Sequence, residues 1–102
     1  MTGSKLADTV PPLTSEQRLA VPAHVYSRPF GEQVVLLDFG HGDYFGLDEV
    51  GAVLWSTAEQ GGCVGDAVSR VIAEFDGTEE QVTIDLLALA TELLQHRLLE
   101  RA

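Results

Sequence analysis

The segment over residues 43–58 most constrains the fold of this chain. Aromatic and smaller residues alternate there with the period-2 pattern of a β-strand, in the order Asp43, Tyr44, Phe45, Gly46, Leu47. Asp48 follows as a suitable helix N-cap. Apolar residues then recur at helical spacing, at Val50, Val53, Leu54 and Ala58. The sequence therefore predicts a short strand that runs directly into an amphipathic helix.

The composition is that of one small globular domain. Of its 102 residues, 45% are hydrophobic and 22% are charged. No apolar run approaches the ~20 residues that cross a bilayer, and residues 1–13 lack the basic start and apolar core of a secretory signal. We therefore expect a cytoplasmic protein that does not bind a membrane. Cys63 is the only cysteine, which excludes an internal disulfide and a cysteine-built zinc site.

The charge is strongly acidic. The formal net charge is −10, from 16 acidic and 6 basic residues. Residues 1–20 contain two of each and are neutral, so the whole excess falls on the remainder. Binding to a phosphate backbone depends on cations that release counterions, so nucleic acid is not an expected partner. A basic or apolar peptide is easier to accommodate.

The first part of the chain predicts an arm followed by a small sheet. Residues 1–20 are rich in Thr, Ser, Gly and Pro and predict a flexible N-terminal arm, with one domain over residues 21–102. Three β-rich segments follow, at residues 23–28, 33–39 and 44–47. Because the connections between them are short, we expect a three-stranded antiparallel meander.

Helical periodicity continues after this sheet. The first helix should end at Gly61-Gly62, and the second carries an apolar stripe from Val64 to Phe75. The third opens with a capping box, in which Thr78 caps the helix and Gln81 reaches back. The predicted fold class is α+β: an N-terminal three-stranded antiparallel sheet followed by a three-helix bundle resembling a winged helix-turn-helix.

The predicted third helix carries more apolar surface than one packed face needs. One stripe runs through Val82, Leu86, Leu89 and Leu93. A second stripe beside it runs through Leu87, Ala90 and Leu94. Together they span more than the ~100° of a single packed face. Either both stripes are buried, or one lines a groove beside the third strand, where an extended peptide could pair with a free strand edge.

Catalytic and metal-binding patterns are absent from the sequence. His24, His41 and His96 are widely separated and form no i, i+4 pair. Ser, His and Asp occur without a nucleophile elbow or a comparable arrangement. We therefore expect no enzymatic activity, no metal and no cofactor.

From about residue 21 to residue 99 the chain resembles domains of the PQQ biosynthesis protein D (PqqD) family, also called RiPP recognition elements. The matching features are Tyr44-Phe45-Gly46-Leu47, Gly51, Trp55, the Val64–Phe75 helix, Asp85, Leu89-x-x-x-Leu93 and Leu98-Leu99-Glu100. The family often has Asn in place of Asp48, and Asp caps equally well. It often has Gly in place of Arg97, where Gly gives a left-handed helix end. The sequence therefore leaves the end of the third helix undetermined.

The resemblance implies non-catalytic binding of the leader segment of a ribosomally synthesised precursor peptide. Family members add the leader as a strand to the third strand, beside the third helix, and present it to a separate maturation enzyme. A leader peptidase of lasso peptide assembly is favoured here, with a radical SAM enzyme of a PQQ-type pathway second. The peptide-binding residues implied by the resemblance are Asp43, Tyr44, Phe45, Gly46, Leu47, Thr83, Asp85, Leu87, Ala90, Thr91 and Leu94.

Two other functions stay open on the sequence alone. A winged-helix DNA-binding regulator needs a basic recognition helix, but the only cations of the third helix lie near its end, at Arg97 and Arg101. A dimeric scaffold subunit would use the apolar third helix as its seam. We expect a monomer, or a dimer through the free edge of the third strand.

Overall fold

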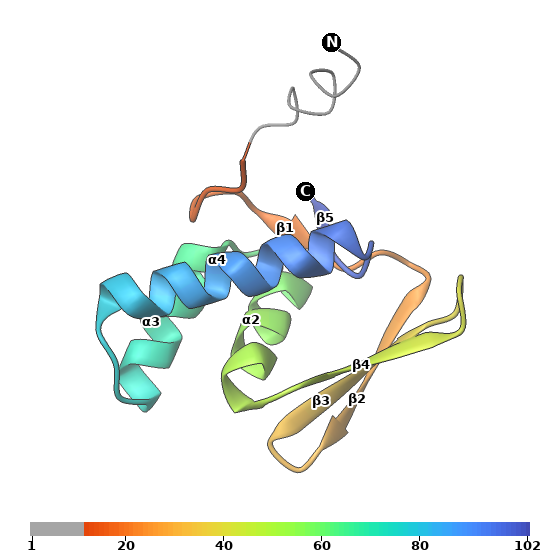
Figure 1. Cartoon of the computed structure of the whole chain (residues 1–102), viewed down its shortest axis with the longest axis horizontal. Helices are drawn as coiled ribbons and strands as arrows, with labels where there is room; N and C mark the ends of the chain where they lie inside the picture. Colours follow the sequence, from red (N-terminus) through yellow and green to blue (C-terminus); the bar gives the residue numbers. More distant parts are fainter. Residues whose placement is uncertain (1–11) are drawn as a thin grey trace, which may run out of the picture.

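The computed structural model describes residues 12–102, so most of the predicted arm lies outside the described residues. The described part of the chain is α+β, with three helices (Figure 1). Its elements in order are β1 (Leu19–Ala20), β2 (Val25–Phe30), β3 (Gln33–Asp38), β4 (Asp43–Leu47), α2 (Glu49–Glu59), α3 (Val64–Glu74), α4 (Glu79–Gln95) and β5 (Glu100–Arg101). No helix in the described part of the chain is long and apolar enough to cross a membrane.

The predicted meander is present as an antiparallel sheet with strand order β2-β3-β4. Leu36 in β3 lies opposite Ser27 in β2 and Phe45 in β4, and its side chain is fully buried. Leu47, two residues after Phe45, is also buried, so this set of alternating positions faces the core. Strand β4 pairs with β3 alone, and its other edge has no strand partner among the described residues.

A second, two-stranded sheet was not predicted. Strand β1 pairs antiparallel with β5, with Leu19 opposite Arg101 and Ala20 opposite Glu100. The expectation of one sheet was therefore incomplete, because the partner strands are about 80 residues apart and two residues long, too short for a periodic pattern. Leu19 is fully buried and its amide donates to the Gly62 carbonyl at 2.9 Å. The end of the predicted arm is thus packed against the domain, and the part of the predicted arm over residues 1–11 lies outside the described residues.

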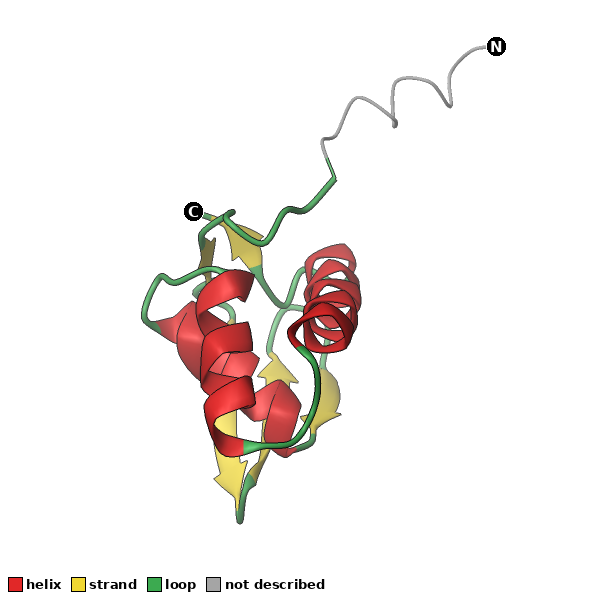
Figure 2. Ribbon diagram, turned by 90° about the vertical axis from the view of Figure 1, so that its left-hand side faces the viewer, coloured by secondary structure: helices red, strands yellow, loops and turns green. Residues whose placement is uncertain are grey.

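The three helices pack against one another (Figure 2), and α2 contacts both sheets, through β1 on one side and through β3 and β4 on the other. The Asp48 side chain caps α2 by accepting from the Gly51 amide at 2.8 Å. A Cβ added at Gly51 would lie 3.2 Å from atoms of both Leu47 and Leu89, so glycine allows strand β4, helix α2 and helix α4 to meet closely. Trp55 is only 2% exposed and fills the core beneath them.

Helix α4 ends in a Schellman motif. Arg97 adopts a left-handed conformation with φ of 60°. The Arg97 amide donates to the Leu94 carbonyl at 3.0 Å, and the Leu98 amide donates to the Leu93 carbonyl at 2.8 Å. The helix end typical of glycine therefore forms with arginine, at the cost of steric strain between its Cβ and the backbone.

We predict that Leu19→Ala lowers the free energy of unfolding by about 2–5 kcal/mol, because it removes a fully buried side chain. Ile84→Ala, at a residue that is 56% exposed, is the control and should change it by no more than about 0.5 kcal/mol. Urea unfolding of the full chain measures both values. Equal, small effects would mean that β1 detaches from the domain in solution.

We also predict that Arg97→Gly raises the free energy of unfolding by up to about 1 kcal/mol, because glycine relieves the left-handed strain. Gln95→Gly, two residues earlier and inside the helix, should instead lower it by about 1 kcal/mol. The same urea titrations give both values, and a destabilised Arg97→Gly protein would contradict the strain assignment.

Candidate functional site

The candidate site begins at the free edge of β4. Phe45 is partly buried and faces the helices, whereas Tyr44 is 75% exposed on the opposite face. Gly46 is exposed and has open space where a side chain would stand. The backbone between Asp43 and Leu47 is therefore accessible along one edge, where its N–H and C=O groups have no strand to pair with.

One side of helix α4 faces this strand. Leu89 lies against the junction of β4 and α2, close to Leu47 and Gly51. About two helical turns after Leu89, the ring of His96 lies 5.2 Å from the ring of Phe45, measured between ring centroids. Asp85 lies four residues before Leu89, and Glu92 lies four residues before His96. Residues four apart share one side of a helix, so both acids lie on this side of α4.

A cleft of about 480 Å³ lies between β4 and the C-terminal end of α4. Its wall mixes ring systems, acids and cations, contributed by Asp38, His41, Asp43, Tyr44, Phe45, Gln95, His96, Arg97 and Leu98. Such a wall offers stacking and charged hydrogen bonds to an extended chain that lies along β4.

Most of the helix residues predicted for the site lie elsewhere. Ala90 is fully buried and cannot touch a ligand in this structure. Thr91 and Leu94 line a different cleft of about 660 Å³, beside Leu13 and Pro22. Thr83 lines a third hollow beside residues of the segment before β1 and of α3.

The helical period explains this difference. The second stripe of α4 begins about 100° beyond the core stripe on the side away from β4, and Leu87 belongs to it. Thr83, Thr91 and Leu94 line other hollows, whereas Leu89 lies at the junction of β4 and α2. The sequence pattern showed two stripes but could not show which of them borders the third strand.

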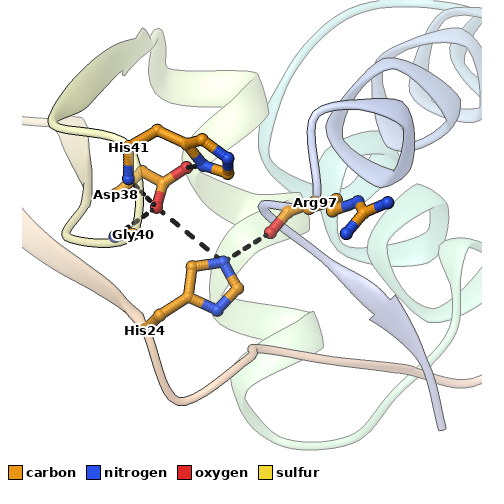
Figure 3. Close-up of polar contacts among 5 residues, drawn as sticks. All are labelled: His24, Asp38, Gly40, His41 and Arg97. Atoms are coloured by element: carbon orange, nitrogen blue, oxygen red, sulfur yellow. Dashed lines mark hydrogen bonds and ion pairs between the residues drawn. The ribbon is translucent and has the colours of Figure 1, made fainter.

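A polar cluster at the end of the cleft was missed by the sequence reasoning (Figure 3). Asp38, at the end of β3, is only 4% exposed. Its carboxylate accepts from the Gly40 amide at 2.8 Å, from the His41 amide at 3.3 Å and from the His41 ring Nδ1 at 3.0 Å. The hydrogen bond from His41 is the main reason why the pKa of Asp38 is lowered, and burial opposes it.

The same cluster connects the sheet to the end of α4. His24 Nε2 lies 3.8 Å from the Asp38 carboxylate and 3.1 Å from the carbonyl oxygen of Arg97, the residue with left-handed backbone. The cluster therefore fixes the β3–β4 turn relative to the helix end, at the border of the cleft. The sequence signal that could have indicated this cluster was Asp38, a single acid at the end of a nearly continuous apolar strand.

Like charges meet at the opposite end of β4. Glu49, the first residue of α2, has a raised pKa, chiefly because its side chain hydrogen-bonds to that of Glu32. Charge repulsion from Glu32, then burial, then repulsion from Asp48 add to the effect. A cation placed there would relieve this repulsion. Within residues 12–102, no group of three or more His, Cys, Asp or Glu side chains is arranged to hold a metal ion.

Comparison with known proteins places this site in context. The family described as Coenzyme PQQ synthesis protein D (PqqD) matches residues 33–99. A solved structure described as TbiB1 in complex with the TbiA(beta) leader peptide is 34% identical, with a TM-score of 0.74, over 79% of this chain and 94% of TbiB1. A lasso peptide synthetase B1 complexed with the leader peptide is 20% identical, with a TM-score of 0.72, over 80% and 96% of the two chains, and shares the fold. No curated protein matches significantly.

We predict that Asp38→Asn destabilises the protein near neutral pH and has less effect in acid. Because the pKa of Asp38 is lower in the folded state than its ordinary 3.8, its contribution is present above that value and is lost as the pH falls through the folded-state pKa. Urea unfolding of both proteins between pH 3 and pH 7, roughly spanning this range, measures it. Asp43→Asn, at an exposed residue, is the control, and a difference independent of pH would contradict the assignment.

Proposed function

This chain belongs to the PqqD family, and from that premise we propose that it binds the leader segment of a ribosomally synthesised precursor peptide without catalysing a reaction. The observation that carries the proposal is the free edge of β4 beside one face of α4. The 34% identical TbiB1, whose described complex contains a leader peptide, supports it.

Strand addition is the proposed mode of binding. The leader would extend the sheet beyond β4, with backbone hydrogen bonds from Asp43 to Leu47 supplying affinity independent of sequence. Alternate side chains would point toward the helices and meet Phe45, Leu89 and His96. Specificity would come from these apolar and aromatic contacts.

Charge favours a leader with basic residues. Asp85 and Glu92 lie on the side of α4 that faces β4, and Glu32 repels Glu49 at one end of the strand. Asp85 accepts from Gln81 Nε2 at 2.9 Å and keeps its second carboxylate oxygen for a cation. A basic leader residue at this end would therefore be attracted by several carboxylates.

The bound leader would be presented to a separate maturation enzyme. We favour a leader peptidase of a lasso peptide pathway, because the resemblance favours it and a lasso peptide synthetase B1 has the same fold. A radical SAM enzyme of a PQQ-type pathway is the second candidate. Binding to DNA finds no support, since α4 carries four acidic residues and neither Lys nor Arg, and the winged-helix classification stays a prediction.

We predict that the synthetic leader of the precursor encoded with this protein binds saturably to the full chain. Amide NMR shifts should concentrate in Asp43–Leu47 and in Leu89–His96, since these segments border the free strand edge. A scrambled leader is the control. Absence of binding would refute the proposed function, and shifts confined to the cleft around Thr91 and Leu94 would refute the proposed groove.

A matched pair of substitutions separates the two sides of α4. Leu89 and Leu94 are both partly buried beside the core, but only Leu89 lies near β4. Leu89→Glu should weaken leader binding at least about tenfold, because it puts a charge against an apolar contact, whereas Leu94→Glu should change it less than about twofold. Fluorescence polarisation with labelled leader measures both, and circular dichroism checks that both variants fold. The opposite ranking would assign binding to the cleft that Leu94 lines.

A further inference from the structure

The outer face of the three-stranded sheet is unusually aromatic. The helices cover only the face of the sheet that carries Leu36 (Figure 1). Among the described residues, four of the six exposed large hydrophobic side chains belong to the sheet or its turn: Tyr26, Phe30, Phe39 and Tyr44, with exposed fractions of 58%, 71%, 66% and 75%. An apolar group of this size is typical of an interaction surface rather than of scattered surface residues.

The strand register gathers these side chains on one face. Tyr26, Leu37 and Tyr44 lie directly opposite one another across the three strands. They alternate with the buried Val25 and Leu36 and therefore point away from the helices. The Phe39 ring extends the row, with its centroid 4.9 Å from that of Tyr26.

Beside this row of side chains, the outer face of the sheet has a hollow. A depression of about 360 Å³ is lined by Arg28, Pro29, Phe30, Val35 and Leu37. Gly46 lies opposite Val35 in β4 and has no atom within 4 Å of the place where its Cβ would be, so no side chain fills that side. The hollow is wide enough for an apolar side chain of another protein.

Arg28 is the single charged residue that lines the hollow. It makes no hydrogen bond or ion pair with the described residues, although acidic residues outnumber basic ones 16 to 6. The residues that share this face by alternation include no acid. A carboxylate from outside the chain would therefore meet an unpaired guanidinium at the border of an apolar hollow.

We propose that this outer face, formed by Tyr26, Arg28, Phe30, Leu37, Phe39 and Tyr44, docks the separate maturation enzyme, through an apolar projection of that enzyme with a carboxylate opposite Arg28. Exposed aromatic residues around an arginine are the composition of energetically dominant interface centres. The identity of the partner rests on the proposed function, whereas the surface itself does not.

A second copy of this chain fits the face poorly. A symmetric pairing brings the same patch together twice, so it would enclose two Arg28 side chains and offer neither of them a carboxylate. Two chains of charge −10 also repel each other. The charges therefore favour a different protein as the occupant.

The position of the face suits coupling to leader binding. Tyr44 belongs to β4, the strand whose free edge is the proposed leader site. A leader strand added there would extend the same sheet, and its outward side chains would continue the aromatic face. The enzyme could then contact the domain and the bound leader on one continuous surface.

The test uses the full chain and the purified leader peptidase encoded beside it, in biolayer interferometry with and without leader. Phe30→Ser and Arg28→Glu should each weaken binding of the enzyme at least about tenfold, because they remove an aromatic contact and reverse the charge of the hollow. Ile84→Ser removes another exposed apolar residue, from α4, and is the control, with a change under about twofold. All three variants should bind leader within about twofold of the unaltered chain.

Several outcomes would overturn the proposal. The proposal is wrong if the unaltered chain does not bind the enzyme. It is also wrong if Ile84→Ser weakens binding as much as Phe30→Ser and Arg28→Glu do, or if those two substitutions leave binding unchanged. A dimer in sedimentation that Phe30→Ser converts to monomer would assign the face to a second copy instead. If the unaltered chain binds the enzyme but does not bind leader, the proposed function is wrong and the proposed docking surface is still supported.

Discussion

The packing of Gly51 against Leu47 and Leu89 sets the distance between strand β4 and helix α4. A Cβ at Gly51 would lie 3.2 Å from side-chain atoms of both neighbours, closer than an ordinary van der Waals contact, so a larger residue would require Leu47 or Leu89 to shift. The Asp48 cap begins α2 immediately after β4 and leaves no loop that could absorb such a shift. The groove beside β4 exists because these three elements meet at one close contact.

Both proposed surfaces follow from a three-stranded sheet that is covered on one face. The helices bury the face that carries Leu36, and β3 pairs with β2 on one side and with β4 on the other. The outer edge of β4 and the aromatic outer face, which share Tyr44, are left accessible. A small domain can thus engage an extended peptide and a protein surface at once, because backbone pairing and side-chain docking use perpendicular directions of the same sheet.

The two ends of the groove differ in charge. At one end, His24 and His41 flank the buried Asp38, and His24 also contacts the carbonyl oxygen of Arg97 at the helix terminus. At the other end, Glu32 and Glu49 bring carboxyl groups together without a cation among the described residues. The histidine cluster is satisfied within the protein, whereas a positive charge placed beside the acidic pair would relieve the repulsion between its carboxyl groups.

The sequence by itself determined the elements, because period-2 alternation, the Asp48 and Thr78 caps and the apolar stripes are local signals. It also determined the family, through residues spread over the same elements. Only the tertiary structure decided which stripe of α4 borders β4, since both stripes have the same period and the choice depends on how the helix rotates when Leu89 packs at Gly51. The pairing of β1 with β5 and the meeting of His24, Asp38 and His41 were likewise decided by contacts between distant residues, which no local pattern encodes.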